Sequence, residues 1–545
     1  MIHRFQKIWL AFNETERQYA IGLTAVFCVA LIGIIWIFVL TATVETAARG
    51  GTFRIGLIGQ PTSLNPLLAN GQAEKDLSHL LFSPLSELTE TIQPTKKSDG
   101  WTIRLKENLI WHDGEPVTSD DIVFTIEEIQ DPSTHSPLFP FWQGVKAERL
   151  SEREIKITAP ARSAPLLFEN YIKNLLFIPK HIFVSIPPQN WSLSDYNLKP
   201  IGNGPYRFQK LVLQNDGFLD SYTFSSFAQG STEHAPYIQT IVVRFFKDKE
   251  EAETAFRYGT IDGLGGLDPY EAKSINRPSN VVLYDSPGYY AVFLNQSQNE
   301  ILHDRNIRQA LSLAVPRNEL LGTVLNNYGK AMTGPSNSTH TQTTSSISDL
   351  LAASGWVVNS IGKLERTEAG ESVQPKTLEL TVPDLPFLEH TAQILKTAWE
   401  KIGFSVTIKL LPQKTVIEEI VPRRDYQMLL FGNIPQPRED LYPFWHSSQV
   451  FHPGLNLSLY KNSDLDSLLQ RMRLTTSTGE RATIANSINN TLENTQPAIF
   501  LYSPSYVYLT TKSLHGIEAT STFLFPEDRF LDIENWYIRT KRVLK

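Results

Sequence analysis

Residues 377–431 read TLELTVPDLPFLEHTAQILKTAWEKIGFSVTIKLLPQKTVIEEIVPRRDYQMLLF and alternate apolar strands with helices. In the longer helix the apolar side chains recur at helical spacing, so they form one stripe for burial. Strands that alternate with helices pair in parallel through right-handed crossovers. The segment therefore predicts a βαβαβ layer. Its predicted elements are strand 378–382, helix Leu388–Ile402, strand 404–411, helix 415–420 and strand 427–431.

A second α/β region opens near residue 50. A strand is expected at Thr52–Ile58, followed by a polar turn and an apolar helix around Ala73–Leu81. From 101 to 129 the pattern changes to short alternating runs, which are typical of antiparallel strands, and then to a helix. Thr118 followed by Asp121 fits a capping box at the start of that helix. We interpret the polar residues of this region as turn and cap residues.

Composition bounds the class of protein. The chain has 545 residues, enough for three or four domain-sized units at about 150 residues each. It is 41% hydrophobic and 20% charged, which excludes wholesale disorder. The net charge of -7 provides no long-range attraction for phosphate backbones, so nucleic acid is not an expected partner.

The segment Ala20–Leu40 is apolar almost throughout and predicts one transmembrane helix. A span needs about 20 residues, whereas the apolar part of a signal peptide has about 7 to 15, so the length favours a retained anchor. The alternative is cleavage, because Thr46-Ala47-Ala48 offers a small-x-small pattern just beyond the span. The single cysteine, Cys28, lies inside this segment, so no disulfide is expected within the chain.

The charges around the span predict its orientation. Arg4, Lys7 and Arg17 precede it and Glu45 is the first charge after it, so residues 1–19 are expected in the cytoplasm. No second apolar run of 18 or more residues follows. We therefore expect a single-pass protein of the cell membrane with an extracytoplasmic main body.

Motifs for catalysis are missing. The chain has no HExxH, P-loop, GxGxxG, CxxC or GxSxG pattern, and Cys28 is its only thiol. His446 and His452 are close in sequence, but two histidines without a third ligand are typical of ordinary loop residues. The sequence therefore predicts no enzyme, no metal and no cofactor.

Several segments, read in chain order, resemble the family 5 solute-binding proteins of ABC importers, which include oligopeptide, dipeptide and nickel binders. The resemblance covers about residues 51–545. The most specific match is LKENLIWHDGEPVTSDDIVFTIE at 105–127. Other matches are PTSLNPL at 61–67, GNGPYRF at 202–208, FRYGTIDGL at 256–264, FLNQ at 293–296 and DRNIRQALSLAVPRNEL at 304–320.

The resemblance implies an α/β fold, a two-lobed periplasmic-binding-protein clamshell with an extra subdomain, preceded here by one transmembrane helix. The chain is expected to cross the hinge near Tyr289–Asn295 and near Ile499–Ser505. The implied division is 1–19 cytoplasmic segment, 20–40 transmembrane anchor, 51–92 first segment of lobe I, 93–195 extra subdomain, 196–290 second segment of lobe I, 291–500 lobe II and 501–545 C-terminal return to lobe I.

The implied function is a membrane-tethered receptor that binds a peptide-like solute in an interlobe cleft and delivers it to the permease subunits of an ABC importer, without turnover. The receptor is expected to be monomeric. Two alternatives remain open on the same scaffold: an extracellular peptidase, against which the missing motifs argue, and a sensory ectodomain whose partner supplies the signalling domain.

The resemblance also implies where a ligand is held. Peptide binders of the family follow the strand that matches QMLLF with a Gly-Trp pair and an aspartate for the ligand's amino terminus; here Gln436 takes the aspartate position. Either Asp440 has taken over the amine contact or the ligand lacks a free amino terminus. Trp445 is a candidate apolar wall, with core packing as the alternative. The expected ligand-binding residues are Tyr289, Asn295, Gln436, Asp440 and Trp445.

Overall fold

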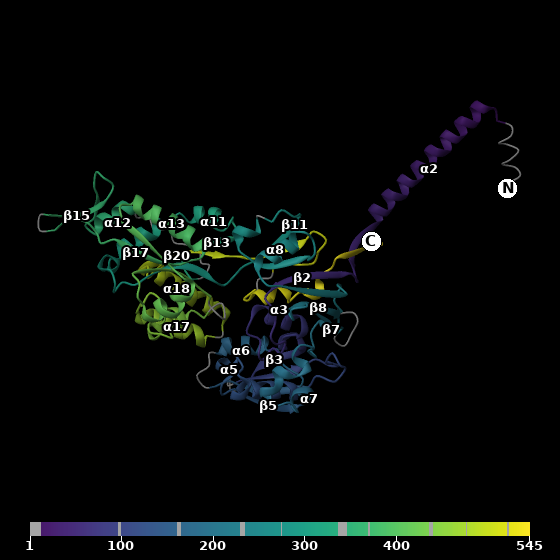
Figure 1. Ribbon diagram of the computed structural model, residues 1–545, viewed down its shortest axis with the longest axis horizontal. Helices are drawn as coiled ribbons and strands as arrows, with labels where there is room; N and C mark the ends of the chain where they lie inside the picture. The colour runs from purple at the N-terminus through teal and green to yellow at the C-terminus, as the bar shows by residue number, and fades with distance from the viewer. Residues whose placement is uncertain are drawn as a thin grey trace.

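The computed structural model describes residues 12–95, 100–160, 165–228, 235–273, 275–335, 346–368, 371–434, 440–475, 477–519 and 523–544. A lone helix projects from a body of several sheets (Figure 1). This helix, α2 (Glu14–Ala42), has exposed side chains along its length and begins with a capping box between Asn13 and Glu16. Within it, Glu14–Phe38 is long and apolar enough to cross a membrane.

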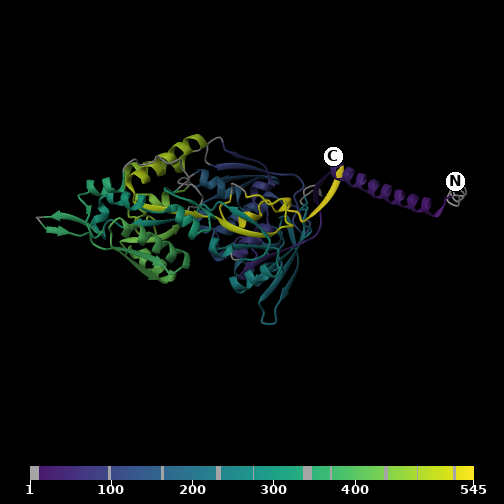
Figure 2. The same cartoon turned by 90° about the horizontal axis from the view of Figure 1, so that it is seen from above.

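Strand β1 (Thr43–Ala48) follows α2 directly and pairs antiparallel with β22 (Arg539–Leu544), the last described strand. We call this pair the β1–β22 ribbon. It is a sheet of its own, and Figure 2 shows its last strand reaching the base of α2.

Lobe I is built on a seven-stranded sheet in the order β11-β21-β10-β2-β9-β8-β7. Strand β2 lies between β9 and β10 and runs parallel to both. Helix α8 (Lys249–Arg257) connects β9 to β10, as a crossover between parallel strands requires. The predicted strand at 52–58 is confirmed. The strands are β2 (Thr52–Ile58), β7 (Tyr206–Leu213), β8 (Leu219–Ser226), β9 (Thr240–Phe246), β10 (Gly263–Leu267), β11 (Ser279–Tyr284) and β21 (Tyr506–Thr511).

Lobe II is built on a six-stranded sheet in the order β13-β20-β12-β19-β17-β18. Strand β17 pairs in parallel with β18 on one side and β19 on the other, which confirms the βαβαβ layer. The helix between β17 and β18 is α13 (Pro386–Lys401). The strands are β12 (Tyr289–Leu294), β13 (Gly329–Ala331), β17 (Leu378–Pro383), β18 (Val406–Leu411), β19 (Met428–Asn433) and β20 (Ala498–Pro504).

The second helix of this layer differs from the regular helix expected at 415–420. It consists of α14 (Gln413–Thr415), a π-helical turn η7 (Val416–Ile420) and α15 (Val421–Arg423). Pro422 lacks a backbone N–H, which is consistent with an irregular hydrogen-bond pattern here. The other lobe II helices are α10 (Arg305–Leu313), α11 (Arg317–Thr323), α12 (Ile347–Ala353), α16 (Tyr442–Trp445), α17 (Ser463–Leu474) and α18 (Thr478–Thr495).

A four-stranded antiparallel sheet in the order β3-β4-β6-β5 forms a further body beside lobe I (Figure 1). The predicted capping box between Thr118 and Asp121 is present at the start of α4. The strands are β3 (Thr89–Pro94), β4 (Gly100–Leu105), β5 (Lys146–Ser151) and β6 (Glu154–Thr158), and the helices are α4 (Ser119–Gln130), α5 (Phe139–Trp142), α6 (Pro165–Lys173) and α7 (Lys180–Phe183).

Two smaller units complete the fold. Helix α3 (Gln72–Leu81) packs in lobe I against the short helix η9 (Pro526–Phe530), far along the chain. A small sheet at the outer end of lobe II contains β14 (Val357–Val358), β15 (Leu364–Glu368) and β16 (Glu371–Val373).

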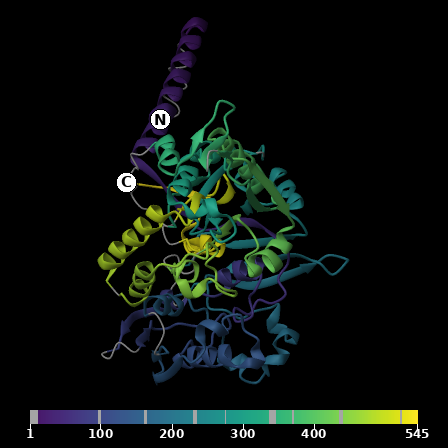
Figure 3. The same cartoon turned by 90° about the vertical axis from the view of Figure 1, so that its left-hand side faces the viewer.

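The core follows the sheets. One buried cluster joins lobe I to the four-stranded sheet, and a separate pair of clusters lies on the two faces of the lobe II sheet. Figure 3 shows the four-stranded sheet and its helices gathered at the bottom of the view. The two large sheets therefore have separate interiors, which lets them act as separate bodies.

The sheets lie slightly off the expected boundaries. Strand β12 begins at Tyr289 and β20 ends at Pro504, so both belong to the lobe II sheet beyond the expected limits of 291–500. Strand β3 begins at Thr89, before the expected start of the extra subdomain at residue 93. The division into lobes stays a prediction.

Candidate functional site

Two chain segments pass between lobe I and lobe II side by side. In lobe I, β11 pairs with β21 and ends with Tyr284 opposite Tyr506. In lobe II, β12 pairs with β20, and Tyr290 lies opposite Tyr502. Both pairs are antiparallel, so the segments 279–294 and 498–511 form one two-stranded crossing ribbon through both sheets.

The strand pairing of the crossing ribbon is interrupted at its middle. Residues 285–288 separate β11 from β12, and Ser505 alone separates β20 from β21. The passages therefore lie just before Tyr289 and at Ser505, and Tyr289–Asn295 belongs to lobe II rather than to the passage itself. A few connecting residues that absorb backbone rotation are what a hinge requires.

Side chains tie the two strands together at this point. Ser503 Oγ donates a hydrogen bond to the Ser286 carbonyl at 3.1 Å, and Gly288 N donates to Ser286 Oγ at 3.2 Å. Lys330 Nζ lies 2.5 Å from an Asp285 carboxylate oxygen. Of these three contacts, the Ser503–Ser286 bond joins the two crossing strands, whereas the Gly288 bond lies within residues 285–288 and Lys330 belongs to the neighbouring strand β13.

Tyr289 lies at the hinge end of β12, opposite Asn433 at the end of β19. Its hydroxyl accepts a hydrogen bond from Asn433 Nδ2 at 3.2 Å, and its ring packs 5.3 Å from that of Phe500. Burial raises the pKa of Tyr289, since an apolar site disfavours the phenolate. Tyr289 is 1% exposed and belongs to a buried cluster of lobe II.

Asn295 lies at the other end of β12, beyond Leu294. Its backbone N–H donates to the Gln427 carbonyl and its Nδ2 to the Arg424 carbonyl, both from the turn before β19. The six residues of β12, at about 3.3 Å each, separate it from the hinge. The structure does not bring Asn295 together with Tyr289.

Trp445 packs in the core of lobe II. It is 1% exposed, and its ring lies 6.3 Å from Phe293 and 5.7 Å from Phe500. In the structure Trp445 is therefore a core residue, which was the alternative that the sequence left open. A ligand wall formed by Trp445 needs these rings to separate.

Asp440 is held by an arginine that sequence analysis did not single out. Its two carboxylate oxygens accept hydrogen bonds from Arg473 Nε at 2.9 Å and Arg473 Nη2 at 2.5 Å. The guanidinium also lies over the ring of Tyr442 at 3.9 Å. Asp440 is 7% exposed, so its charge is already balanced by a two-pronged partner.

This Asp440–Arg473 pair faces the body built on the four-stranded sheet. Helix α6 of that body contacts α17, which carries Arg473. Burial raises the pKa of Tyr171 on α6, and the Asp440 carboxylate raises it further while Arg473 opposes the shift. The pair therefore lies where lobe II meets the four-stranded body.

Gln436 lies outside the described residues, in the segment 435–439 between β19 and Asp440. The last described residue before that segment is Ile434, which is 57% exposed and lies close to Gly288 of the hinge. The expected ligand loop thus leaves lobe II beside the hinge and resumes beside Arg473.

Most of the chain matches a known protein family. Residues 83–452 match the model for bacterial extracellular solute-binding proteins, family 5 Middle. The chain belongs to this family. It is 24% identical over 535 residues to the oligopeptide-binding protein AppA of Bacillus subtilis, covering 90% of this chain and 92% of the relative.

Solved structures share the fold of this family 5 protein. The structure of Bacillus subtilis AppA in complex with a nonapeptide aligns with a TM-score of 0.61 at 22% identity, over 91% of this chain and 100% of that one. The periplasmic murein tripeptide binding protein MppA in its unliganded open form aligns with a TM-score of 0.73 at 19% identity, over 91% of this chain and 99% of that one. The two-lobed fold is confirmed.

His446, one of the two histidines considered for a metal, has other partners. His446 stacks on Tyr442 at 4.1 Å and its ring nitrogens lie within 3.0 Å of Ser448 Oγ and Gln470 Nε2. Within the portion of the chain that the structure describes, no group of three or more His, Cys, Asp or Glu side chains is arranged to hold a metal ion.

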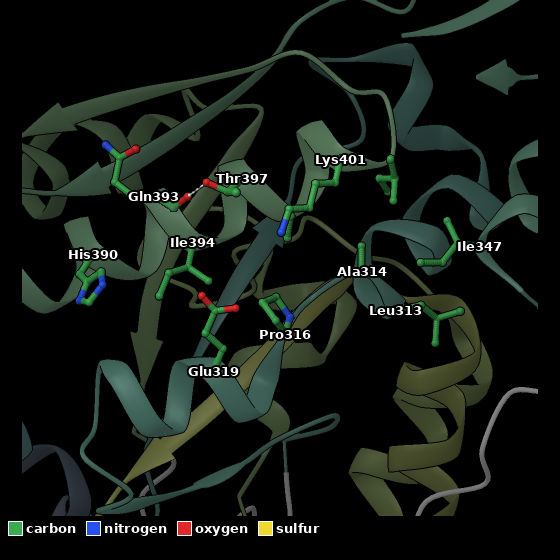
Figure 4. Close-up of a pocket in the computed structure, with 12 residues that line it drawn as sticks. Leu313, Ala314, Pro316, Glu319, Ile347, His390, Gln393, Ile394, Thr397 and Lys401 are labelled. Carbon is green, nitrogen blue, oxygen red and sulfur yellow. Dashed lines mark hydrogen bonds between the residues drawn. The ribbon is translucent and has the colours of Figure 1, made fainter. Parts of the chain in front are cut away.

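A cavity of about 450 Å³ lies elsewhere on lobe II of the family 5 protein. It opens between α13 and the segment that joins α10 to α11, and Figure 4 shows Glu319 and Lys401 directed toward its middle. None of the four expected ligand-binding residues that the structure describes, Tyr289, Asn295, Asp440 and Trp445, lines it. The cavity therefore lies apart from these four residues.

Sequence reasoning missed Arg473 and Ser286, whereas Ser503 lies within the hinge crossing predicted near Ile499–Ser505. Arg473 lies 33 positions from Asp440, and no local pattern connects the two. Ser503 and Ser286 are 217 positions apart. A helix whose last turn carries basic residues, as at 463–474, was the only available signal for Arg473.

Proposed function

We propose that this chain is a membrane-tethered extracytoplasmic receptor that binds a peptide-like solute between its lobes and delivers it intact to an ABC importer. The observation that carries the proposal is the crossing ribbon: two lobes with separate cores are joined by two paired strands, and the chain passes from one sheet to the other at 285–288 and at Ser505. Such a connection permits the lobes to close on a ligand as rigid bodies.

Closure needs no chemistry. A ligand that touches both lobes binds the closed state more tightly, and that difference in affinity shifts the equilibrium between open and closed states. The TM-score of 0.73 with an unliganded open form, against 0.61 with a peptide complex, supports an arrangement with the lobes apart. The bound state is then a closed form of the same two bodies.

Relatives support a peptide-like ligand. AppA is named an oligopeptide-binding protein and was solved with a nonapeptide, and MppA is named for a murein tripeptide. A backbone offers regularly spaced donors and acceptors, which an extended cleft between two sheets is suited to hold.

The Asp440–Arg473 pair favours one of the two alternatives for the ligand's amino terminus. Because both carboxylate oxygens already accept from Arg473, capture of an ammonium by Asp440 requires the loss of a charge-assisted bidentate pair. We infer that Asp440 positions Arg473 at the α6–α17 contact. The amine of the ligand is then bound elsewhere or is absent.

The β1–β22 ribbon supports a retained anchor. The candidate cleavage pattern Thr46-Ala47-Ala48 lies within β1, paired with residues 539–541 of β22. Cleavage after Ala48 would remove β1 and leave β22 without its partner. If α2 is retained, β1 is retained with it, and its pairing with β22 joins the first and last described strands at the base of the span.

A peptide mixture separates the receptor from the peptidase. Purified protein is incubated with the mixture, and bound and free fractions are followed by mass spectrometry over hours. Recovery of intact bound peptides with an unchanged free pool is expected. Time-dependent cleavage products would assign the chain to the peptidase alternative, and a requirement for a membrane partner that signals on binding would assign it to a sensor.

Anchoring is tested on the mass of the protein from its native membrane. We expect a chain that retains α2, is extracted only by detergent and is digested when intact cells are treated with protease. A shorter chain that begins near Arg49 and is released in aqueous buffer would show that the segment is a signal peptide.

A further inference from the structure

The β1–β22 ribbon raises a question of stability. A two-stranded ribbon is marginal in water unless a third element covers it. All six residues of β22 are exposed, and the ribbon is a sheet of its own. Something outside the described chain is therefore expected to lie against it.

The ribbon is apolar at the end nearest the membrane helix. Thr43, which follows the last residue of α2, lies opposite Leu544, and Val44 lies opposite Val543. Leu544 is 74% exposed, and Val44 and Val543 are also solvent-exposed. Exposed apolar side chains at this level suit the boundary between acyl chains and headgroups.

The next residues along the ribbon are basic. Beyond Val543, β22 carries Arg542, Lys541 and Arg539, against a single acid of β1, Glu45. Arg542 donates to Glu45 Oε1 and Thr43 Oγ, both at 3.2 Å. The ribbon thus has an excess of positive charge on a protein whose net charge is -7.

Geometry places these cations beside the headgroups. With Ala20–Leu40 across the hydrocarbon layer, the ribbon starts within the interfacial layer, and its strands rise about 3.4 Å per residue. Arg542 and Lys541 then lie within about one Debye length of the surface. The positive-inside rule counts cations close in sequence to the ends of a span. Arg542 is 497 residues from Glu45 in sequence, so the rule does not apply to these cations.

From this juxtaposition of an apolar end and three cations at the base of the span, we propose that the β1–β22 ribbon is a binding surface for the anionic phospholipids of the outer leaflet. The phosphate headgroups pair with Arg539, Lys541 and Arg542, while Leu544 and Val543 enter the interface. The contact holds lobe I at a fixed height above the membrane. This inference rests on the retained anchor proposed above.

The test uses the full chain in nanodiscs of phosphatidylcholine alone or of equal amounts of phosphatidylcholine and phosphatidylglycerol. Hydrogen exchange of residues 539–544 is followed by mass spectrometry. We expect exchange to slow in the anionic discs by about five-fold for each cation that engages. Salt at about 0.5 M should remove the difference, because it shortens the screening length to a few ångströms.

The variant R539Q/K541Q/R542Q should exchange equally in both kinds of disc. The matched control K376Q/K401Q/K414Q removes three exposed cations from lobe II, which lies far from α2, and should keep the difference (Figure 1). The urea midpoint of each variant shows that the body stays folded.

Equal exchange of the native ribbon in the two lipid compositions would overturn the lipid surface while leaving the anchor intact. A chain recovered outside the discs would overturn the anchor and this inference together. The two failures are therefore distinguishable in one preparation.

Discussion

Ser503 Oγ donates a hydrogen bond to the carbonyl oxygen of Ser286 across 3.1 Å, at the point where two strands leave one sheet and enter another. Tyr284 faces Tyr506 on the lobe I side of this contact, and Tyr290 faces Tyr502 on the lobe II side. The pair thus marks the axis about which the lobes are proposed to close.

Ser503→Ala removes the donor of this contact. We expect the free energy of unfolding to fall by about 1 kcal/mol, because the half-buried Ser286 carbonyl loses a partner. Urea denaturation measures the change. Ser467→Ala is the control, since its hydroxyl bonds only within an exposed helical turn. Equal midpoints for the two variants would deny the contact a structural role.

Asp76 and Arg529 form an ion pair that is almost completely buried in lobe I, with side chains 2% and 1% exposed. Asp76→Asn leaves the guanidinium charge buried without its counter-ion, so we expect a loss of about 3 to 5 kcal/mol in the free energy of unfolding. Asp216→Asn breaks an exposed pair with Lys247, whose charges solvent already screens, and should cost far less. Similar losses in both variants would contradict the argument from burial.

His112 makes the protein sensitive to acid. It is held neutral between the Gly204 carbonyl at 3.0 Å and the Gly202 N–H at 3.1 Å, and burial lowers its pKa to about 4. Between about pH 6.5 and 4 the unfolded chain binds a proton that the folded chain does not, so stability falls as the pH falls through this window. The loss reaches about 3 kcal/mol by pH 4.

Unfolding by urea at several pH values measures the slope. His112→Gln, which keeps one donor and one acceptor, should flatten it, whereas His135→Gln, at an exposed histidine, should not. A slope that survives His112→Gln would assign the acid sensitivity to another group.

Asp440→Asn tests how the ligand's amino terminus is held. If Asp440 acts by positioning Arg473, then Asp440→Asn, Arg473→Gln and the double variant should lower affinity for a bound peptide equally. Blocking the peptide's amine should then change affinity by the same amount in the native protein and in Asp440→Asn, because Asp440 does not contact the amine. Calorimetric titration measures all four. A loss of about 2 to 5 kcal/mol on amine blocking and on Asp440→Asn, with Arg473→Gln unchanged, would instead place the ammonium on Asp440.

Local pattern was sufficient for the elements. Helical spacing of apolar residues in 388–402 predicted α13, which is found at Pro386–Lys401. The strand predicted at 52–58 agrees with β2, because its alternating apolar residues are the ones that the sheet buries. The irregular helix at 413–423 was not foreseen, since the sequence pattern does not distinguish a π-helical turn from regular helix.

The site depended on contacts that no local pattern records. The large apolar ring of Trp445 suits a ligand wall, but it packs against Phe293 and Phe500, which lie on two strands far apart in sequence. Asp440 has the charge for an ammonium, but Arg473 reaches it from another helix. The pairing of β1 with β22 joins the first and last described strands and bears on whether the N-terminal segment is retained.

Mass spectrometry of ligand retained through gentle purification tests the receptor directly. We expect acid to release an intact peptide-like molecule in stoichiometric amount. Adding this molecule back at a hundredfold excess over Kd should raise the free energy of unfolding by about 2.7 kcal/mol without consuming it. Release of no ligand, together with a stability unmoved by every peptide pool, would contradict a peptide receptor.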